Sequence, residues 1–147
     1  MSHPVYVLNG PTLNLLGTRE PEIYGHMTLA DIERNVTAHA KTKGLAIDFR
    51  QSNHEGELVD WVQEAGKQGS GLILNAAAYT HTSVALHDAL RAIDIPIIEV
   101  HLSNPYKRER FRRFSYVSQV ASGVICGFKD TGYLLAVDAM AVLIAAQ

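Results

Sequence analysis

Short apolar runs alternate with longer amphipathic stretches along the whole chain. The apolar runs are brief, mostly rich in Val, Ile or Leu, and flanked by Gly, Pro or Asn, as β-strands are. The five predicted strands cover residues 4–8, 46–50, 71–74, 95–100 and 123–126. Four of them are apolar nearly throughout, which is typical of a parallel sheet covered on both faces.

Helical periodicity fills the intervals between the predicted strands. Thr28 and Asp31 have the spacing of a capping box, and Gly44 suits the end of the same helix. The apolar helix positions are Leu29, Ile32 and Val36, then Leu58, Val62 and Ala65, then Ala85, Leu86, Ala89, Leu90 and Ile93, with a last helix over residues 134–146. This alternation predicts an α/β fold, a doubly wound five-stranded parallel sheet of order 2-1-3-4-5.

Length and composition are those of one globular domain over residues 1–147, with 47% hydrophobic and 19% charged residues. The net charge of -2 gives no general reason to bind nucleic acid. No window approaches the ~18 apolar residues of a membrane span, and MSHPVYVLNG lacks the pattern of a secretory signal. We therefore expect a cytoplasmic protein. Cys126, the only cysteine, excludes a disulfide framework and is expected to pack in the core.

A long polar segment, LNGPTLNLLGTREPEIYG, follows the first predicted strand. Loops in compact α/β domains usually have roughly 2 to 6 residues, so residues 8–25 are interpreted as an active-site lid or binding loop without a helix. Arg19 and Tyr24 are its candidates for chemistry. A phenol is a poor base near neutral pH unless a cation favours the phenolate, and Arg19 offers that cation. Surface packing is the alternative for Tyr24.

Polar clusters follow the first four predicted strands. Ligands of open α/β sheets bind outside the carboxyl ends of the strands, where these clusters fall. They are Asn9, then Gln51, Ser52, Asn53 and His54, then Asn75, Tyr79, Thr80 and His81, then His101, Ser103 and Asn104. Each residue alone has an ordinary explanation as a turn or helix cap. Their coincidence indicates a functional site at one edge of the sheet.

The fourth predicted strand ends with an acid-base pair. Residues two apart in a strand share a face, so Glu99 and His101 are expected side by side. The carboxylate can then orient the imidazole for proton transfer, although a purely structural pair is the alternative. The basic cluster that follows is Lys107, Arg108, Arg110, Arg112 and Arg113. It is either a solvated turn or an anion site, with Arg112 a candidate partner for a substrate carboxylate or hydroxyl.

Several other site classes lack their sequence patterns. Of the seven histidines, only His81 and His87 lie near each other, and neither HExxH nor CxxC occurs, so no metal site is expected. There is no GxSxG elbow and no phosphate-binding GxxxxGK[ST] loop. Ser83, in THTS, suits a helix cap better than a nucleophile.

Six segments of the chain occur in the order and spacing of one family. They are the long loop quoted above, QSNHEGELVDW, LILNAAAYTHTSVALHDAL, IEVHLSN, RERFRRFSYVS and GVICGFKDTGYLLA. From about Val5 to Ala136 the chain resembles the type II 3-dehydroquinate dehydratases. The resemblance implies a flavodoxin-like lyase that needs no metal or organic cofactor and forms a dodecamer of four trimers. It also implies anti elimination of water from 3-dehydroquinate through an enolate, giving 3-dehydroshikimate, in the shikimate pathway of aromatic amino acid biosynthesis or in quinate catabolism.

The resemblance also assigns roles to individual residues. Tyr24 would remove the C2 proton, Arg19 would stabilise its phenolate, and His101, oriented by Glu99, would protonate the departing C1 hydroxyl. The expected substrate-binding residues are Asn75, His81, Arg112, the backbone of Leu102 and Ser103, and Asp88 from a neighbouring subunit. Closure of the 15–24 loop would exclude water.

Two positions depart from the family pattern. Thr12 stands where the family usually has Asn, at a possible site for the water that contacts the enolate. Ala76 replaces a Pro after Asn75, which predicts a less rigid Asn75. If these changes abolish turnover, the alternative is a flavodoxin-like anion-binding or regulatory module.

Overall fold

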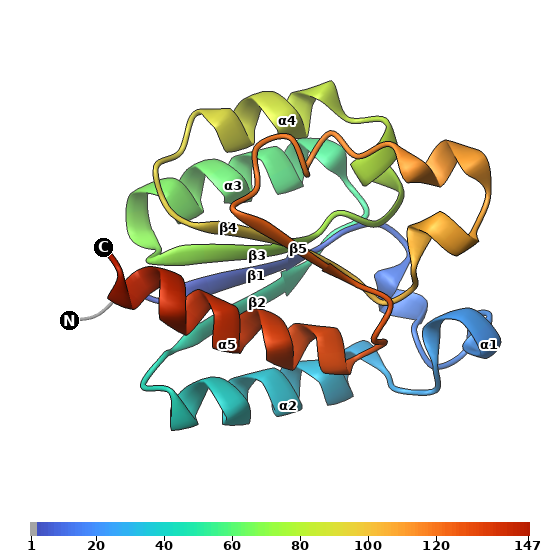
Figure 1. Cartoon of the computed structure of the whole chain (residues 1–147), viewed down its shortest axis with the longest axis horizontal. Helices are drawn as coiled ribbons and strands as arrows, with labels where there is room; N and C mark the ends of the chain where they lie inside the picture. The colour runs from blue at the N-terminus through green and yellow to red at the C-terminus, as the bar shows by residue number, and fades with distance from the viewer. Residues whose placement is uncertain (1–2) are drawn as a thin grey trace.

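The computed structural model describes residues 3–147 and contains one five-stranded parallel sheet (Figure 1). Its order is β2-β1-β3-β4-β5, so the predicted topology is confirmed. The strands are β1 (Val5–Asn9), β2 (Ile47–Gln51), β3 (Gly71–Asn75), β4 (Ile97–His101) and β5 (Gly123–Cys126). All neighbouring strands pair in parallel, and Asn9 pairs in register with Gln51 on one side and Asn75 on the other.

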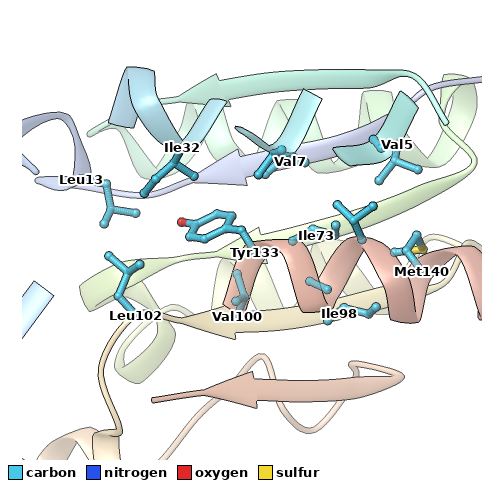
Figure 2. Close-up of a cluster of buried hydrophobic side chains, with 14 of the residues drawn as sticks. Val5, Val7, Leu13, Ile32, Ile73, Ile98, Val100, Leu102, Tyr133 and Met140 are labelled. Atoms are coloured by element: carbon cyan, nitrogen blue, oxygen red, sulfur yellow. The ribbon is translucent and has the colours of Figure 1, made fainter. Parts of the chain in front are cut away.

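Helices cover both faces of the sheet. The longer ones are α2 (Leu29–Thr42), α3 (Glu55–Gln68), α4 (Val84–Arg91) and α5 (Thr131–Ala145). In Figure 1, α3 and α4 lie over one face and α2 and α5 over the other. Figure 2 shows the core under α2 and α5, where Ile32 and Met140 pack against apolar side chains of β1, β3 and β4. Tyr6 and Leu8 of β1 belong to the second core, under α3 and α4.

Local sequence signals define where the helices begin. Thr28 and Asp31 form the predicted capping box, with the Asp31 amide donating to Thr28 Oγ1 and the Thr28 amide to Asp31 Oδ2, each at 3.1 Å. The Ser83 hydroxyl likewise accepts a hydrogen bond from the Leu86 amide at 2.9 Å and caps α4. Ala85 is exposed, so its assignment to the buried face of α4 is wrong, because that face is formed by Leu86, Ala89 and Leu90.

The segment after β1 is not free of helices, contrary to the prediction. It contains a 3-10 turn, η1 (Leu13–Leu15), and a four-residue helix, α1 (Pro21–Tyr24). Pro21 occupies the first turn of α1, where a missing N–H costs nothing. Gly25 ends the helix with φ 89°, in the region that favours glycine. Tyr24 is therefore held on the last position of a short helix.

Cys126 is half-buried, so its assignment to the core is wrong. It lies on β5, an edge strand that pairs only with β4 and is exposed at Gly123 and Val124. Among residues 3–147, no helix is long and apolar enough to cross a membrane.

Candidate active site

A cavity opens at the carboxyl ends of β1, β3 and β4, the edge at which the sequence predicts a site. It occupies about 610 Å³ including its open mouth. The lining residues come from the loop after β1, the turn after β3, and β4 with the segment behind it. They are Pro11, Thr12, Leu13, Arg19, Tyr24, Asn75, Ala77, Ala78, His81, His101, Leu102, Ser103, Pro105, Arg108 and Arg112.

The end of β4 carries the predicted acid-base pair. Glu99 and His101 are both buried, and His101 Nε2 is hydrogen-bonded to Glu99 Oε2. A carboxylate only accepts hydrogen bonds, so Nε2 carries a proton and Nδ1 is the ring nitrogen left for a substrate. Burial opposes the charge of Glu99, but the hydrogen bond and charge of His101 and the hydroxyls of Ser118 and Ser115 hold the pKa of Glu99 below its usual range. An ionised Glu99 stabilises imidazolium, the form of His101 that can donate a proton.

His81 lies beside His101 but carries its ring proton on the other nitrogen. The two rings are stacked with their centroids 6.5 Å apart. His81 Nδ1 lies 2.7 Å from the carbonyl oxygen of Phe114, which can only accept, so Nδ1 carries the proton. Burial is the main cause that lowers the pKa of His81. The neutral ring therefore offers Nε2 as an acceptor for a substrate hydroxyl.

Two guanidinium groups lie near the ring of Tyr24. The Cζ atom of Arg19 lies 4.9 Å from the ring centroid, and that of Arg108 lies 5.3 Å from it. Arg108 is the better fixed of the two, because its side chain is 15% exposed and its Nη1 donates to the Ser103 hydroxyl at 3.2 Å. Arg19 is 37% exposed and pairs with Glu20 at 3.5 Å. Two positive charges therefore lie close to the aromatic ring of Tyr24.

Sequence reasoning missed Arg108 by treating most of the basic cluster as solvated. Lys107, Arg110 and Arg113 are indeed exposed. Arg112 lines the cavity as predicted, with its Nε donating to Glu109 Oε2 at 3.0 Å. Arg108 differs from these neighbours in its position in space, because it lies between η3 (Pro105–Lys107) and η4 (Arg110–Arg113), where its guanidinium reaches the ring of Tyr24.

A buried hydrogen-bond chain fixes Asn75 at the cavity wall. Asn75 Nδ2 donates to the Tyr133 hydroxyl at 3.0 Å, and that hydroxyl donates to Asn9 Oδ1 at 2.7 Å. Asn75 Oδ1 accepts from the Ala77 amide at 3.1 Å. Burial raises the pKa of Tyr133, which keeps its hydroxyl protonated as a donor. One N–H of Asn75 is then left for a substrate. Figure 2 shows Tyr133 among the core residues with its hydroxyl toward Leu13.

Ala76 and Asn75 both lie in a buried turn. Asn75 is 3% exposed and Ala76 is 1% exposed. Gly10 packs directly on Ala76, where an added Cβ would lie 2.4 Å from the Ala76 oxygen. The contact with Gly10 and the hydrogen bond to Tyr133 hold this turn without a proline ring.

Thr12 lies on the cavity wall in an unfavourable backbone conformation. Its φ and ψ are 71° and -8°, in the left-handed region, where a β-branched side chain is strained. Its amide donates to Asn53 Oδ1 at 3.0 Å, which holds the turn in place. Asparagine tolerates this region far better than threonine.

The residues to which the resemblance assigns catalytic or binding roles converge with one exception, whereas the polar residues 51–54 after β2 do not line the cavity. Tyr24, Arg19, His101, Asn75, His81, Leu102, Ser103, Arg112 and Thr12 all line the cavity, and Glu99 supports His101 from behind. Asp88 is exposed on α4 and does not line the cavity of its own chain. Within residues 3–147, no three His, Cys, Asp or Glu side chains are grouped so as to hold a metal ion.

Comparison with known proteins gives consistent matches over nearly the whole chain. Residues 3–141 match the family described as dehydroquinase class II. The chain is 60% identical over 141 residues to the 3-dehydroquinate dehydratase of Phenylobacterium zucineum (strain HLK1), covering 96% of this chain and 97% of that relative. It is 57% identical over 138 residues to 3-dehydroquinate dehydratase 2 of Pseudomonas aeruginosa, covering 94% and 93%.

A solved structure shares the fold closely. The type II dehydroquinase from Propionibacterium acnes superposes with a TM-score of 0.92 at 39% sequence identity, covering 97% of this chain and 98% of that one.

Proposed function

The chain belongs to the class II dehydroquinase family, and we propose that it converts 3-dehydroquinate to 3-dehydroshikimate and water by anti elimination through an enolate. The observation that carries the proposal is a base candidate close to two cations and an acid candidate hydrogen-bonded to a buried carboxylate, both lining one cavity. The names of the relatives favour this enzyme over a binding module that has lost turnover.

The base acts first in the proposed sequence. The Tyr24 phenolate takes a proton from C2, and the electrons of the broken C–H bond form an enolate with the C3 carbonyl. Arg19 and Arg108 stabilise the phenolate before this step. The enolate is the species with the most charge to stabilise, so a polar group near its oxygen contributes mainly to the transition state. Thr12 occupies the wall position that we assign to this contact.

The acid completes the elimination. The enolate electrons form the C1–C2 double bond as the C1–O bond breaks, and His101 Nδ1 donates its proton to the departing hydroxyl, which leaves as water. Glu99 stabilises the imidazolium before the transfer. Asn75, His81 and Arg112 bind the hydroxyl and carboxylate groups of the substrate, with the backbone amides of Leu102 and Ser103. These interactions hold the reacting atoms in the orientation that elimination needs.

A covalent imine is not part of the proposal. Imine formation needs a lysine amine at the substrate carbonyl, and no lysine lines the cavity in the described part of the chain. The test is to mix the purified protein with 3-dehydroquinate and follow the absorbance of the conjugated enone product. Turnover should persist in a metal chelator and after treatment with borohydride in the presence of substrate. Absence of turnover by folded protein would overturn the proposed function.

Restoring the family residue at Thr12 should raise kcat. Thr12→Asn supplies an amide that can hold a water at the enolate oxygen and relieves the left-handed strain, which costs on the order of 1 to 3 kcal/mol. The variant should therefore also unfold at a higher temperature, while KM changes less than kcat. Thr12→Ser is the matched control, since it keeps the hydroxyl and gains no amide. An unchanged kcat in Thr12→Asn would disprove the assigned enolate contact.

We further propose that the enzyme works in the cytoplasm as a dodecamer of four trimers in which Asp88 completes the site of a neighbouring subunit. Asp88 is exposed and lies outside its own cavity, as a residue that acts across an interface should. Exposed apolar side chains offer surface for subunit contacts. They are Phe111, Phe114, Val124, Phe128, Leu135 and Val142.

Mixed oligomers test the role of Asp88. Asp88→Ala and Tyr24→Phe proteins should each have low activity alone. After they are dissociated and reassembled together, about one quarter of the sites in a random mixture should combine an intact Tyr24 with an intact Asp88 from the neighbour. Activity should return to about that fraction of wild type. Mixed oligomers as inactive as their components would contradict a shared site, as would full activity of a verified monomer.

A further inference from the structure

The segment from Phe114 to Ser118 lies behind the catalytic histidine and contacts several residues of the site. The Phe114 carbonyl accepts from His81, and the Tyr116 amide donates to the Thr80 carbonyl at 2.9 Å. The segment joins η4 to the turn before β5, and these two hydrogen bonds hold it beside η2 (Ala77–His81). It belongs to the motif RERFRRFSYVS, of which only arginines line the substrate cavity.

Two hydroxyls of this segment reach the carboxylate of Glu99. Ser115 Oγ donates to Glu99 Oε2 at 2.8 Å, the oxygen that also contacts His101. Ser118 Oγ donates to the other oxygen, Oε1. Ser115 Oγ in turn accepts from the amides of Val117 at 3.1 Å and Ser118 at 2.9 Å, which fixes the direction of its own proton. Both carboxylate oxygens of a buried Glu99 are thus satisfied by oriented donors.

We propose that Ser115 and Ser118 are positioning residues of the reaction, which keep Glu99 ionised and aligned so that His101 can act as the general acid. This inference rests on the proposed function. Neither serine lines the substrate cavity. Both instead border a small separate cavity behind Glu99 and His101.

The chemical reason lies in where the proton of the pair resides. With Glu99 ionised, Nε2 of His101 donates to the carboxylate, and a second proton on Nδ1 makes the imidazolium that protonates the leaving group. If Glu99 becomes protonated, it donates to Nε2 instead, and His101 is left as a neutral ring. A neutral imidazole is a far weaker acid than imidazolium, so proton transfer to the hydroxyl slows. The hydroxyl donors of Ser115 and Ser118 oppose protonation of Glu99, because they stabilise its carboxylate anion.

The other titratable or charged groups around this small cavity are His81, Tyr106, Arg112, Arg113 and Cys126. None of these five hydrogen-bonds to Glu99 among the described residues, whose direct partners on the carboxylate are His101, Ser115 and Ser118. The hydroxyls of Ser115 and Ser118 thus help to hold the pKa of Glu99 below its usual range, and each can be removed by a single substitution.

The test compares Ser118→Ala, Ser115→Ala and the double variant with wild type in steady-state turnover of 3-dehydroquinate across pH. Each single change should lower kcat about 10-fold, the size of one lost hydrogen bond to a charged group, with a larger loss in the double variant. KM should change little, because the serines do not line the substrate cavity. The acidic limb of the kcat profile should move to higher pH, since Glu99 then takes up a proton more readily.

Two control variants separate positioning from general damage. Ser118→Thr keeps a hydroxyl and should restore most of kcat and the wild-type pH profile. Ser70→Ala removes a buried hydroxyl that has no partner among the described residues, so it should leave kcat unchanged. A kcat that falls by the same factor at every pH, or that Ser118→Thr fails to restore, would overturn the proposal.

A measurement without substrate separates this proposal from the proposed function. In ¹⁵N NMR of the histidine rings, wild-type His101 should carry its proton on Nε2, hydrogen-bonded to a carboxylate. In the double serine variant, the onset of a neutral ring with the proton on Nδ1 should appear at higher pH. An identical His101 signal in both proteins at every pH would overturn the positioning role. This result does not depend on whether 3-dehydroquinate is turned over.

Discussion

Tyr24→Phe is expected to lower kcat by about 10²- to 10⁴-fold, the usual contribution of a positioned base. The change removes only the phenol oxygen and leaves the ring that Arg19 and Arg108 contact. Because the Tyr24 hydroxyl makes no hydrogen bond within residues 3–147, the fold should be unaffected. KM should change less than kcat, since the oxygen accepts the proton in the transition state and is not needed to bind the substrate.

Steady-state kinetics of the purified variant measures this effect. Tyr106→Phe is the matched control, because Tyr106 is 63% exposed and does not line the substrate cavity. Its kcat should equal that of wild type. If Tyr24→Phe kept a wild-type kcat, another group would have to remove the C2 proton.

His101→Asn is expected to lower kcat by a similar factor of about 10² to 10⁴, through loss of the acid that protonates the leaving group. The asparagine amide can still donate toward Glu99, so the buried carboxylate keeps a partner. A His101→Ala change would leave that charge less satisfied and would mix a stability loss into the result.

The same assay, with the unfolding temperature of each variant, measures the second effect. His39→Asn is the control, because His39 lies outside the cavity on α2 and its Nε2 pairs with Asp138 Oδ1 at 2.7 Å. The His39 variant should retain kcat. A fully active His101→Asn would show that protonation of the hydroxyl does not depend on this ring.

The sequence predicted the sheet well because its signals are local. These signals each extend over only a few residues: the hydrophobic period, the flanking Gly and Pro residues, and the capping pair Thr28 and Asp31. The order of the parallel strands then follows from the way the chain connects them. The pairing of Glu99 with His101 was accessible for the same reason, since alternation along one strand fixes which side chains share a face.

The parts that escaped prediction depend on contacts between distant segments. Tyr133 lies just before the helix predicted over residues 134–146 and has no sequence signal of a role, yet its hydroxyl links Asn9 to Asn75 across a separation of 124 residues in one bond and 58 in the other. Arg108 differs from its basic neighbours only in where the turn after β4 folds. The strain at Thr12 is likewise invisible in the sequence, because a backbone angle is set by the packed loop.

The most direct test of the account follows the C2 proton itself. 3-Dehydroquinate deuterated at C2 on the face opposite the C1 hydroxyl is mixed with the enzyme, and the deuterium content of the product is measured by mass spectrometry. An anti elimination by Tyr24 and His101 predicts a product without the label, whereas label on the other face is retained. Retention of the label from the opposite face would contradict the assignment of Tyr24 and His101 as base and acid in an anti elimination.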